Sequence, residues 1–89
     1  MKLLVLYRPD SEHASRTESF LREFSQRYPD INRIDVLDLN TRDGAATASI
    51  YDVMQYPALI AATDDGIAQQ VWQGDMLPLM SDVSSYFRI

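Results

Sequence analysis

The stretch Tyr51-Asp52-Val53-Met54-Gln55-Tyr56-Pro57-Ala58-Leu59-Ile60 decides the fold of this chain. It has the pattern of a helix end, a proline and then a buried strand, because the residues from Ala58 to Ala62 are all apolar. Cis peptide bonds are essentially confined to proline, and they are built features of a fold. The Tyr56–Pro57 bond is therefore predicted to be cis, and the strand after it is predicted to lie in the centre of a sheet.

The residues after this stretch predict a hairpin and a closing helix. Asp64-Asp65-Gly66 is a strong hairpin turn, because Asp-Gly suits positions that need a positive φ. The returning strand, Gln69 to Gln73, is more polar and is predicted to form an edge of the sheet. Pro78 is predicted at the first position of the last helix, which turns four residues inward: Leu79, Val83, Tyr86 and Phe87.

Two further strands are predicted in the amino-terminal half. Leu3 to Tyr7 is continuously apolar, as in a strand that is covered on both faces. Ile34 to Leu39 is the second strand, and a helix lies between the two. A strand, a helix and a strand in succession form a βαβ unit, so these strands are predicted to be parallel with a right-handed crossover.

The first helix has a clear buried face and two possible starts. Asp10 or Ser11 could cap it, or Ser15 could cap it with Glu18 three residues later completing a capping box. The helix ends before Pro29-Asp30. Its buried face is marked by residues at helical spacing: Phe20, Leu21, Phe24 and Tyr28.

A second helix begins after Thr41 or Asp43, either of which could cap it, and it runs through an alanine-rich segment to Tyr51. The complete order is β-α-β-α-β-β-α, an α/β class with a four-stranded mixed sheet flanked by helices. Residues 1–89 are predicted to form a single domain, since the length allows no more.

Charge and hydropathy exclude some classes of partner. The chain has 8 basic and 13 acidic residues, with a net charge of −5 and a single lysine, Lys2. This balance repels polyanions, so neither nucleic acid nor an anionic membrane is an expected partner. The apolar run at the amino terminus is too short for a signal peptide or a membrane span, so a cytoplasmic location is expected.

The chain contains no cysteine. It therefore supplies no thiolate nucleophile, no disulfide and no thiolate ligand for zinc or an iron–sulfur cluster. One histidine and the absence of calcium-loop spacing give no metal site, and no cofactor is expected.

The predicted order, with a proline directly before the third strand, resembles the thioredoxin-like superfamily, of the thioredoxin and glutaredoxin type. The resemblance covers nearly the whole chain, and Pro57 is its most specific motif. It implies that Tyr56, before the proline, presents a free backbone beside the loop that follows the first strand. Family members use that backbone to hold an extended peptide or glutathione.

The chain departs from the family at the reactive loop. Active members carry Cys-x-x-Cys between the first strand and the first helix. With Pro9 aligned to the glutaredoxin proline, Ser11 and Ala14 stand in place of the two cysteines. Val5 stands in place of the buried acid of classical thioredoxins, an acid that glutaredoxins also lack. Disulfide exchange needs an attacking thiolate, so the resemblance implies the fold without the activity.

The leading hypothesis is a redox-inactive domain that binds a protein or an extended peptide, with no catalytic residue. Its candidate groove is formed by six residues: Arg8, Ser11, Glu12, His13, Tyr56 and Pro57. The first alternative is a non-redox enzyme that uses Ser11 or His13, at the amino terminus of the first helix, on a small anionic substrate. The second is a structural or oligomeric module, including a homodimer through the edge strand at Gln69 to Gln73.

Overall fold

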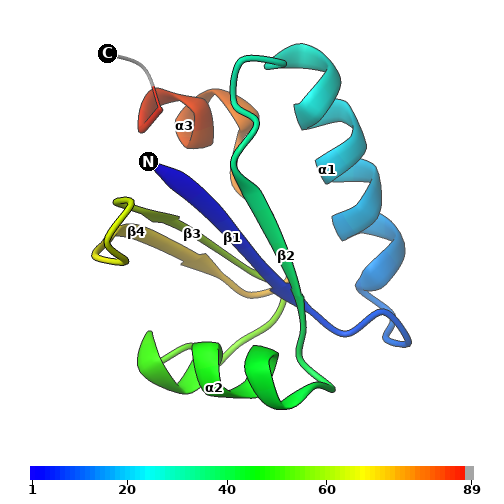
Figure 1. Ribbon diagram of the computed structural model, residues 1–89. Helices are drawn as coiled ribbons and strands as arrows, with labels where there is room; N and C mark the ends of the chain where they lie inside the picture. The colour runs from blue at the N-terminus through cyan, green and yellow to red at the C-terminus, as the bar shows by residue number, and fades with distance from the viewer. Residues whose placement is uncertain (88–89) are drawn as a thin grey trace.

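The structure is a computed structural model that describes residues 1–87 (Figure 1). Its elements confirm the predicted order of strands and helices. In chain order they are β1 (Lys2–Tyr7), α1 (Ala14–Arg27), β2 (Ile34–Asp38), α2 (Arg42–Ile50), β3 (Ala58–Ala62), β4 (Ala68–Gln73) and α3 (Met80–Ser85).

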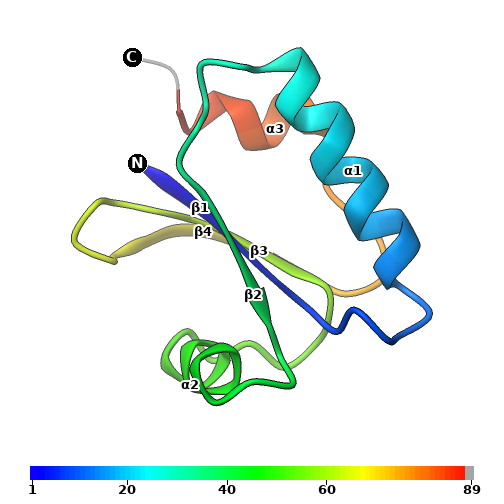
Figure 2. The ribbon, with the colours of Figure 1, turned by 45° about the vertical axis from the view of Figure 1, so that its right-hand side comes forward.

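The four strands form one mixed sheet in the order β2-β1-β3-β4. β1 is parallel to β2, whereas β3 is antiparallel to both of its neighbours, β1 and β4. Figure 2 shows the sheet between two layers, with α1 and α3 on one face and α2 on the other. The predicted parallel βαβ unit and the central position of β3 are both confirmed.

A core lies on each face of the sheet. Leu3, Val5 and Tyr7 pack with Phe24 of α1 and Val83 of α3 on one face. The residues between them on β1, Leu4 and Leu6, belong to a second core with α2. The continuous apolar pattern of β1 and β3 follows from this arrangement, because a central strand covered on both faces buries every side chain.

The start of α1 differs from both predicted starts. The helix begins at Ala14, and its N-cap residue, His13, has αR backbone angles and makes no capping hydrogen bond with its side chain. Ser11 lies in a turn before the helix instead of within it. Glu18 does not complete a capping box with Ser15, since its carboxylate accepts a hydrogen bond from the hydroxyl of Tyr7 at 2.8 Å. The contact between Glu18 and Tyr7 of β1 therefore replaces the capping box that the sequence predicts.

The predicted cap of α2 at Thr41 is confirmed. The Thr41 hydroxyl accepts a hydrogen bond from the backbone N–H of Gly44 at 3.1 Å. Gly44 is also the point at which α2 touches the end of β2. A Cβ atom at this position would lie 2.0 Å from the carbonyl oxygen of Asp38, so only glycine fits.

The start and the inner face of α3 differ from the prediction. The helix begins at Met80, two residues after Pro78. Leu79 has the extended backbone of an N-cap residue, and its side chain is 69% exposed. Val83 is fully buried and Phe87 packs against the same core, as predicted, but the ring of Tyr86 lies at the surface edge-on to Trp72, with centroids 5.5 Å apart. A helix of six residues is too short to turn four side chains to the sheet.

None of the helices in residues 1–87 is long and apolar enough to cross a membrane.

Tyr7 connects the sheet to α1, and its surroundings raise the pKa of its hydroxyl. Burial, the hydrogen bond to Glu18 and the charges of Glu18 and Asp38 all raise the pKa of its hydroxyl above the ordinary value. The stability linked to Tyr7 is therefore fully present below pH ~10 and is lost as pH rises through the folded-state pKa.

We predict that Tyr7→Phe lowers the free energy of unfolding by about 1 kcal/mol at pH 7, because it removes the hydrogen bond to Glu18. The deficit should shrink at alkaline pH, since only the wild type loses stability by ionising this hydroxyl. Urea denaturation of both proteins at pH 7 and at alkaline pH measures the effect. A deficit that is constant with pH would show that the Tyr7 hydroxyl titrates normally.

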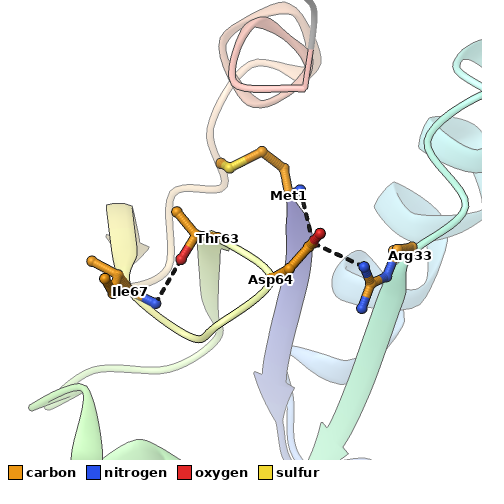
Figure 3. Close-up of polar contacts among 5 residues, drawn as sticks. All are labelled: Met1, Arg33, Thr63, Asp64 and Ile67. Carbon is orange, nitrogen blue, oxygen red and sulfur yellow. Dashed lines mark hydrogen bonds and ion pairs between the residues drawn. The ribbon is translucent and has the colours of Figure 1, made fainter.

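Asp64, in the turn between β3 and β4, holds the start of two strands (Figure 3). Its carboxylate accepts a hydrogen bond from the amino group of Met1 at 2.9 Å and one from the guanidinium of Arg33 at 2.8 Å. The hydrogen bond from the amino terminus and the positive charge of Arg33 lower the pKa of Asp64. Its contribution to stability is therefore present above the ordinary carboxyl pKa and is lost as pH falls through the folded-state pKa.

We predict that Asp64→Asn destabilises the protein slightly at pH 7 and that the difference vanishes in acid. The effect is small because both ion pairs are exposed to solvent. The matched control is Asp65→Asn, at the neighbouring position of the same turn, which should have no such acid-dependent difference. Thermal unfolding between neutral and acidic pH tests this, and equal curves for the two variants would contradict it.

Candidate functional site

The register of the sheet places Arg8 beside Tyr56. Leu6 of β1 lies opposite Ala58 of β3 in an antiparallel ladder, so the next positions along each chain continue the alignment. Two steps further, Arg8 stands opposite Tyr56. The pairing of β1 with β3 therefore brings the loop after β1 next to the segment that contains Pro57. The resemblance to the thioredoxin-like superfamily had implied this proximity.

The segment that leads to Pro57 is held from its far side by the end of β4. The side-chain carbonyl of Gln73 accepts hydrogen bonds from the backbone N–H groups of Met54 and Gln55, at 2.8 and 3.1 Å. The N–H of Gly74 donates to the carbonyl of Pro57 at 3.1 Å. The Tyr56–Pro57 peptide bond itself is cis. These contacts fix the chain on both sides of Tyr56.

Gln73 and Gly74 are site residues that the sequence analysis did not identify. Counting outward from the Asp64-Asp65-Gly66 turn pairs Ala58 with Trp72, and the register shift between Ala61 and Ala62 makes Gln73 the partner of Ala58 instead, so the turn alone does not identify Gln73. Gly74 has a φ of 111°, a conformation that favours glycine. A Cβ there would lie 2.8 Å from the side-chain oxygen of Gln55.

Ser11 and His13 both bind the backbone of Arg8. The Ser11 hydroxyl donates to the Arg8 carbonyl at 2.6 Å, and the Ser11 N–H donates to the same oxygen at 3.1 Å. The Nε2 atom of His13 accepts a hydrogen bond from the Arg8 N–H at 3.2 Å. Both backbone groups of Arg8 are thus satisfied within its own loop.

This loop leaves the backbone of Tyr56 without a partner. In β1, Leu3 and Tyr7 direct their backbone groups toward the β2 side, as the bonds from Leu3 N–H to Arg33 and from Leu39 N–H to Tyr7 show. Alternation along a strand then directs the backbone of Arg8 toward Tyr56. Because Arg8 bonds to Ser11 and His13 instead, no hydrogen bond is recorded for the Tyr56 N–H or carbonyl within residues 1–87.

Five of the six predicted groove residues are at least partly exposed, and we call them the Arg8–Tyr56 surface: Arg8, Ser11, Glu12, His13 and Tyr56. The Arg8 guanidinium lies over the Tyr56 ring, 5.5 Å from its centroid, at the distance of a cation–π contact. Glu12 is exposed, whereas Pro57 is buried and fixes the position of Tyr56 without facing solvent.

The geometry does not assemble a nucleophile and a base. The Ser11 hydroxyl donates to a carbonyl, and the recorded partner of His13 Nε2 is a backbone N–H, so within residues 1–87 no contact joins a serine hydroxyl to the His13 ring. A serine hydrolase needs that contact together with an orienting third group. No cluster of three or more metal-ligating side chains occurs in the same part of the chain.

Comparison with known proteins supports the fold and gives no activity. No family model matches the chain, and no curated protein matches it. Among solved structures, the chain is similar to thioredoxin 1 from the thermophilic eubacterium Thermosipho africanus, with a TM-score of 0.69 and 14% sequence identity. The match covers 98% of this chain and 90% of that one.

The structural match spans the sheet, the helices and the segment around Pro57, but identity at this level establishes the fold alone. The sequence has no cysteine at the loop between β1 and α1 or anywhere else. The chain thus has a thioredoxin-like fold and contains none of the thiols on which thioredoxin chemistry depends.

Proposed function

We propose that this protein is a redox-inactive, thioredoxin-like domain that binds an extended peptide, or an extended segment of a protein, at the Arg8–Tyr56 surface. The observation that carries the proposal is the free backbone of Tyr56, two residues before the start of β3.

The hydrogen bonds between β1 and β3 end at the pair Leu6 and Ala58, and Arg8 does not pair with Tyr56. A bound peptide could supply the missing partner of Tyr56. An incoming strand residue opposite Tyr56 would exchange two backbone hydrogen bonds with it, as the residues of β1 do with those of β3. Strand addition of this kind gives affinity through the main chain and needs no thiol. The function proposed is therefore holding a ligand, with no covalent step.

The surface is suited to an extended ligand because its framework is fixed before binding. Gln73 and Gly74 hold the chain on either side of Tyr56, and Ser11 and His13 hold the Arg8 loop. Binding to a preorganised site avoids the entropic cost of ordering it. The Arg8 guanidinium lies over the Tyr56 ring, and Glu12 is an exposed carboxylate in the loop that follows Arg8, so charges of both signs are available to a ligand of mixed charge.

The test begins with selection of linear peptides against the purified protein from a random display library. A selected peptide is then synthesised with a single N-methyl group at each position in turn, which removes one backbone donor. We expect one position, opposite Tyr56, to lose about fivefold or more in affinity, the equivalent of about 1 kcal/mol. Calorimetric titration measures each affinity.

Two arginine variants form a matched pair for the same titration. Arg8→Ala should weaken binding, whereas Arg22→Ala, on the exposed side of α1, should leave it unchanged. Failure to select any linear peptide would contradict the proposal. So would a peptide whose affinity is equal at every N-methylated position, because its main chain would then play no part.

A further inference from the structure

Within residues 1–87, no strand pairs with the outer side of β2, which is an open edge of the sheet (Figure 1). The bonds from Leu3 N–H to Arg33 and from Leu39 N–H to Tyr7 show which backbone groups face β1. By alternation, the N–H and carbonyl groups of Ile34, Val36 and Asp38 point away from the sheet. Edges of this kind are templates for pairing with another strand.

β2 is a more regular edge than β4, the edge that the sequence pattern had favoured. The register between β1 and β2 runs without interruption from Ile34 to Asp38. The register between β3 and β4 shifts at Ala61 and Ala62. Such irregularities twist an edge and protect it from pairing, whereas a regular edge remains available.

Apolar side chains lie exposed beside the same edge. Val36 is 50% exposed, and Ile50, on α2, is 74% exposed. A cavity of about 530 Å³ lies between the strand and the helix, lined by Ile34 to Leu37 and by Ile50, among others. The edge therefore combines free backbone groups with apolar surface.

We propose that β2 pairs with β2 of a second copy of this chain, antiparallel and related by a two-fold axis through Val36. A two-fold axis requires the surface to be complementary to itself. Centred on Val36, the pairing uses all of the strand and sets Ile34 opposite Asp38 and Asp35 opposite Leu37. Centred on Asp35, it would set two carboxylates directly opposite each other, which is unfavourable.

The free backbone groups can form most of the hydrogen bonds of this register. Val36 would exchange both of its hydrogen bonds with Val36 of the second copy, and the N–H of Asp38 would donate to the Ile34 carbonyl. The Asp38 carbonyl already accepts the N–H and the hydroxyl of Thr41, so the Ile34 N–H of the second copy gains no bond from it and stays with solvent. Leu37 of the second copy would lie opposite Asp35, at the cavity beside Ile50.

The first test is the oligomeric state of the wild type and of two lysine variants by sedimentation equilibrium. The wild type should show a concentration-dependent dimer. Val36→Lys sets two like charges opposite each other on the axis and should raise the dissociation constant about tenfold or more. Gln70→Lys makes the same charge change at an exposed position of β4 and should leave the dimer unaffected.

The second test uses the absence of cysteine, which makes any introduced thiol unique. Directly paired residues that exchange hydrogen bonds have Cα atoms about 5.5 Å apart, within the range for a disulfide. Val36→Cys should therefore form a disulfide-linked dimer under mild oxidation faster than Gln70→Cys. A monomeric wild type at the highest attainable concentration, or equal cross-linking of both variants, would overturn the proposal.

The pairing is independent of peptide binding, because Val36 and Tyr56 lie on opposite sides of β1. Dissociation by Gln70→Lys with no effect of Val36→Lys would place the dimer at β4 and contradict the inference. A peptide selected against the protein that competes with cross-linking through Val36→Cys would identify the occupant of the edge as an extended ligand and equally contradict it.

Discussion

Gly44→Ala should destabilise the protein by about 3 kcal/mol, although helix propensity alone favours the substitution by about 1 kcal/mol. The new Cβ would lie 2.0 Å from the carbonyl oxygen of Asp38 and 2.6 Å from its carbonyl carbon. Both atoms belong to the backbone at the end of β2, so no side-chain rotation relieves the overlap. Either α2 must move away from the sheet or β2 must end early.

The matched control is Ser49→Ala, at an exposed position of the same helix. It should change the free energy of unfolding by less than about 0.5 kcal/mol. Denaturant titration followed by circular dichroism measures both variants. A Gly44→Ala variant as stable as the wild type would mean that α2 does not lie as close to Asp38 as the structure places it.

Phe24→Ala should remove about 3–5 kcal/mol from the free energy of unfolding. Phe24 is fully buried and packs against the rings of Phe20 and Tyr28, with centroids 5.9 and 5.1 Å away. Truncation leaves a cavity in the core that joins α1 to the sheet. A domain of this size has total stability of roughly 5–10 kcal/mol, so the variant should be close to unfolded at room temperature.

Leu79→Ala truncates an exposed apolar side chain and is compared with Phe24→Ala, which truncates a buried one. The helical spacing of the sequence placed Leu79 in the core, which would predict a loss of 2 kcal/mol or more, in the range of about 2–5 kcal/mol for buried leucines. Since its side chain is 69% exposed, we expect a loss of less than about 1 kcal/mol. Thermal unfolding separates the two expectations, and a large effect of Leu79→Ala would contradict the position of α3.

The strands and their order along the chain were predictable because they depend on patterns that no nearby residue contradicts. The apolar runs of β1 and β3 leave no solvent face, and Pro57 stands directly before a strand. The turn at Asp64-Asp65-Gly66 then fixes the direction of β4, with Gly66 at a φ of 90° as its position requires. Each of these signals is local and agrees with the fold as a whole.

The start of α1 was not predictable from local signals. Ser11 and Ser15 both had the residue type of a cap, yet the structure uses neither for this purpose. Ser11 bonds to Arg8, and Glu18 bonds to Tyr7, a residue of the sheet. Capping preferences are worth only about 1 kcal/mol, so such tertiary contacts can outweigh them.

The candidate site was predicted as a set of residues but not as an arrangement. The resemblance placed Arg8 and Tyr56 together, and the sheet register gives the reason. The sequence could not show that Ser11 and His13 form hydrogen bonds with the backbone of Arg8, because residue type alone does not distinguish a reactive side chain from a hydrogen-bond partner of the loop. Their role is to keep Arg8 away from Tyr56.

The free backbone of Tyr56 is the central claim, and amide hydrogen exchange measured by NMR tests it most directly. In the free protein, the Tyr56 N–H should exchange quickly, whereas the N–H of Leu59, within β3, should be protected. Saturation with a selected peptide should slow exchange at Tyr56. A Tyr56 amide already protected in the free protein, or one that still exchanges quickly with the peptide bound, would contradict the account.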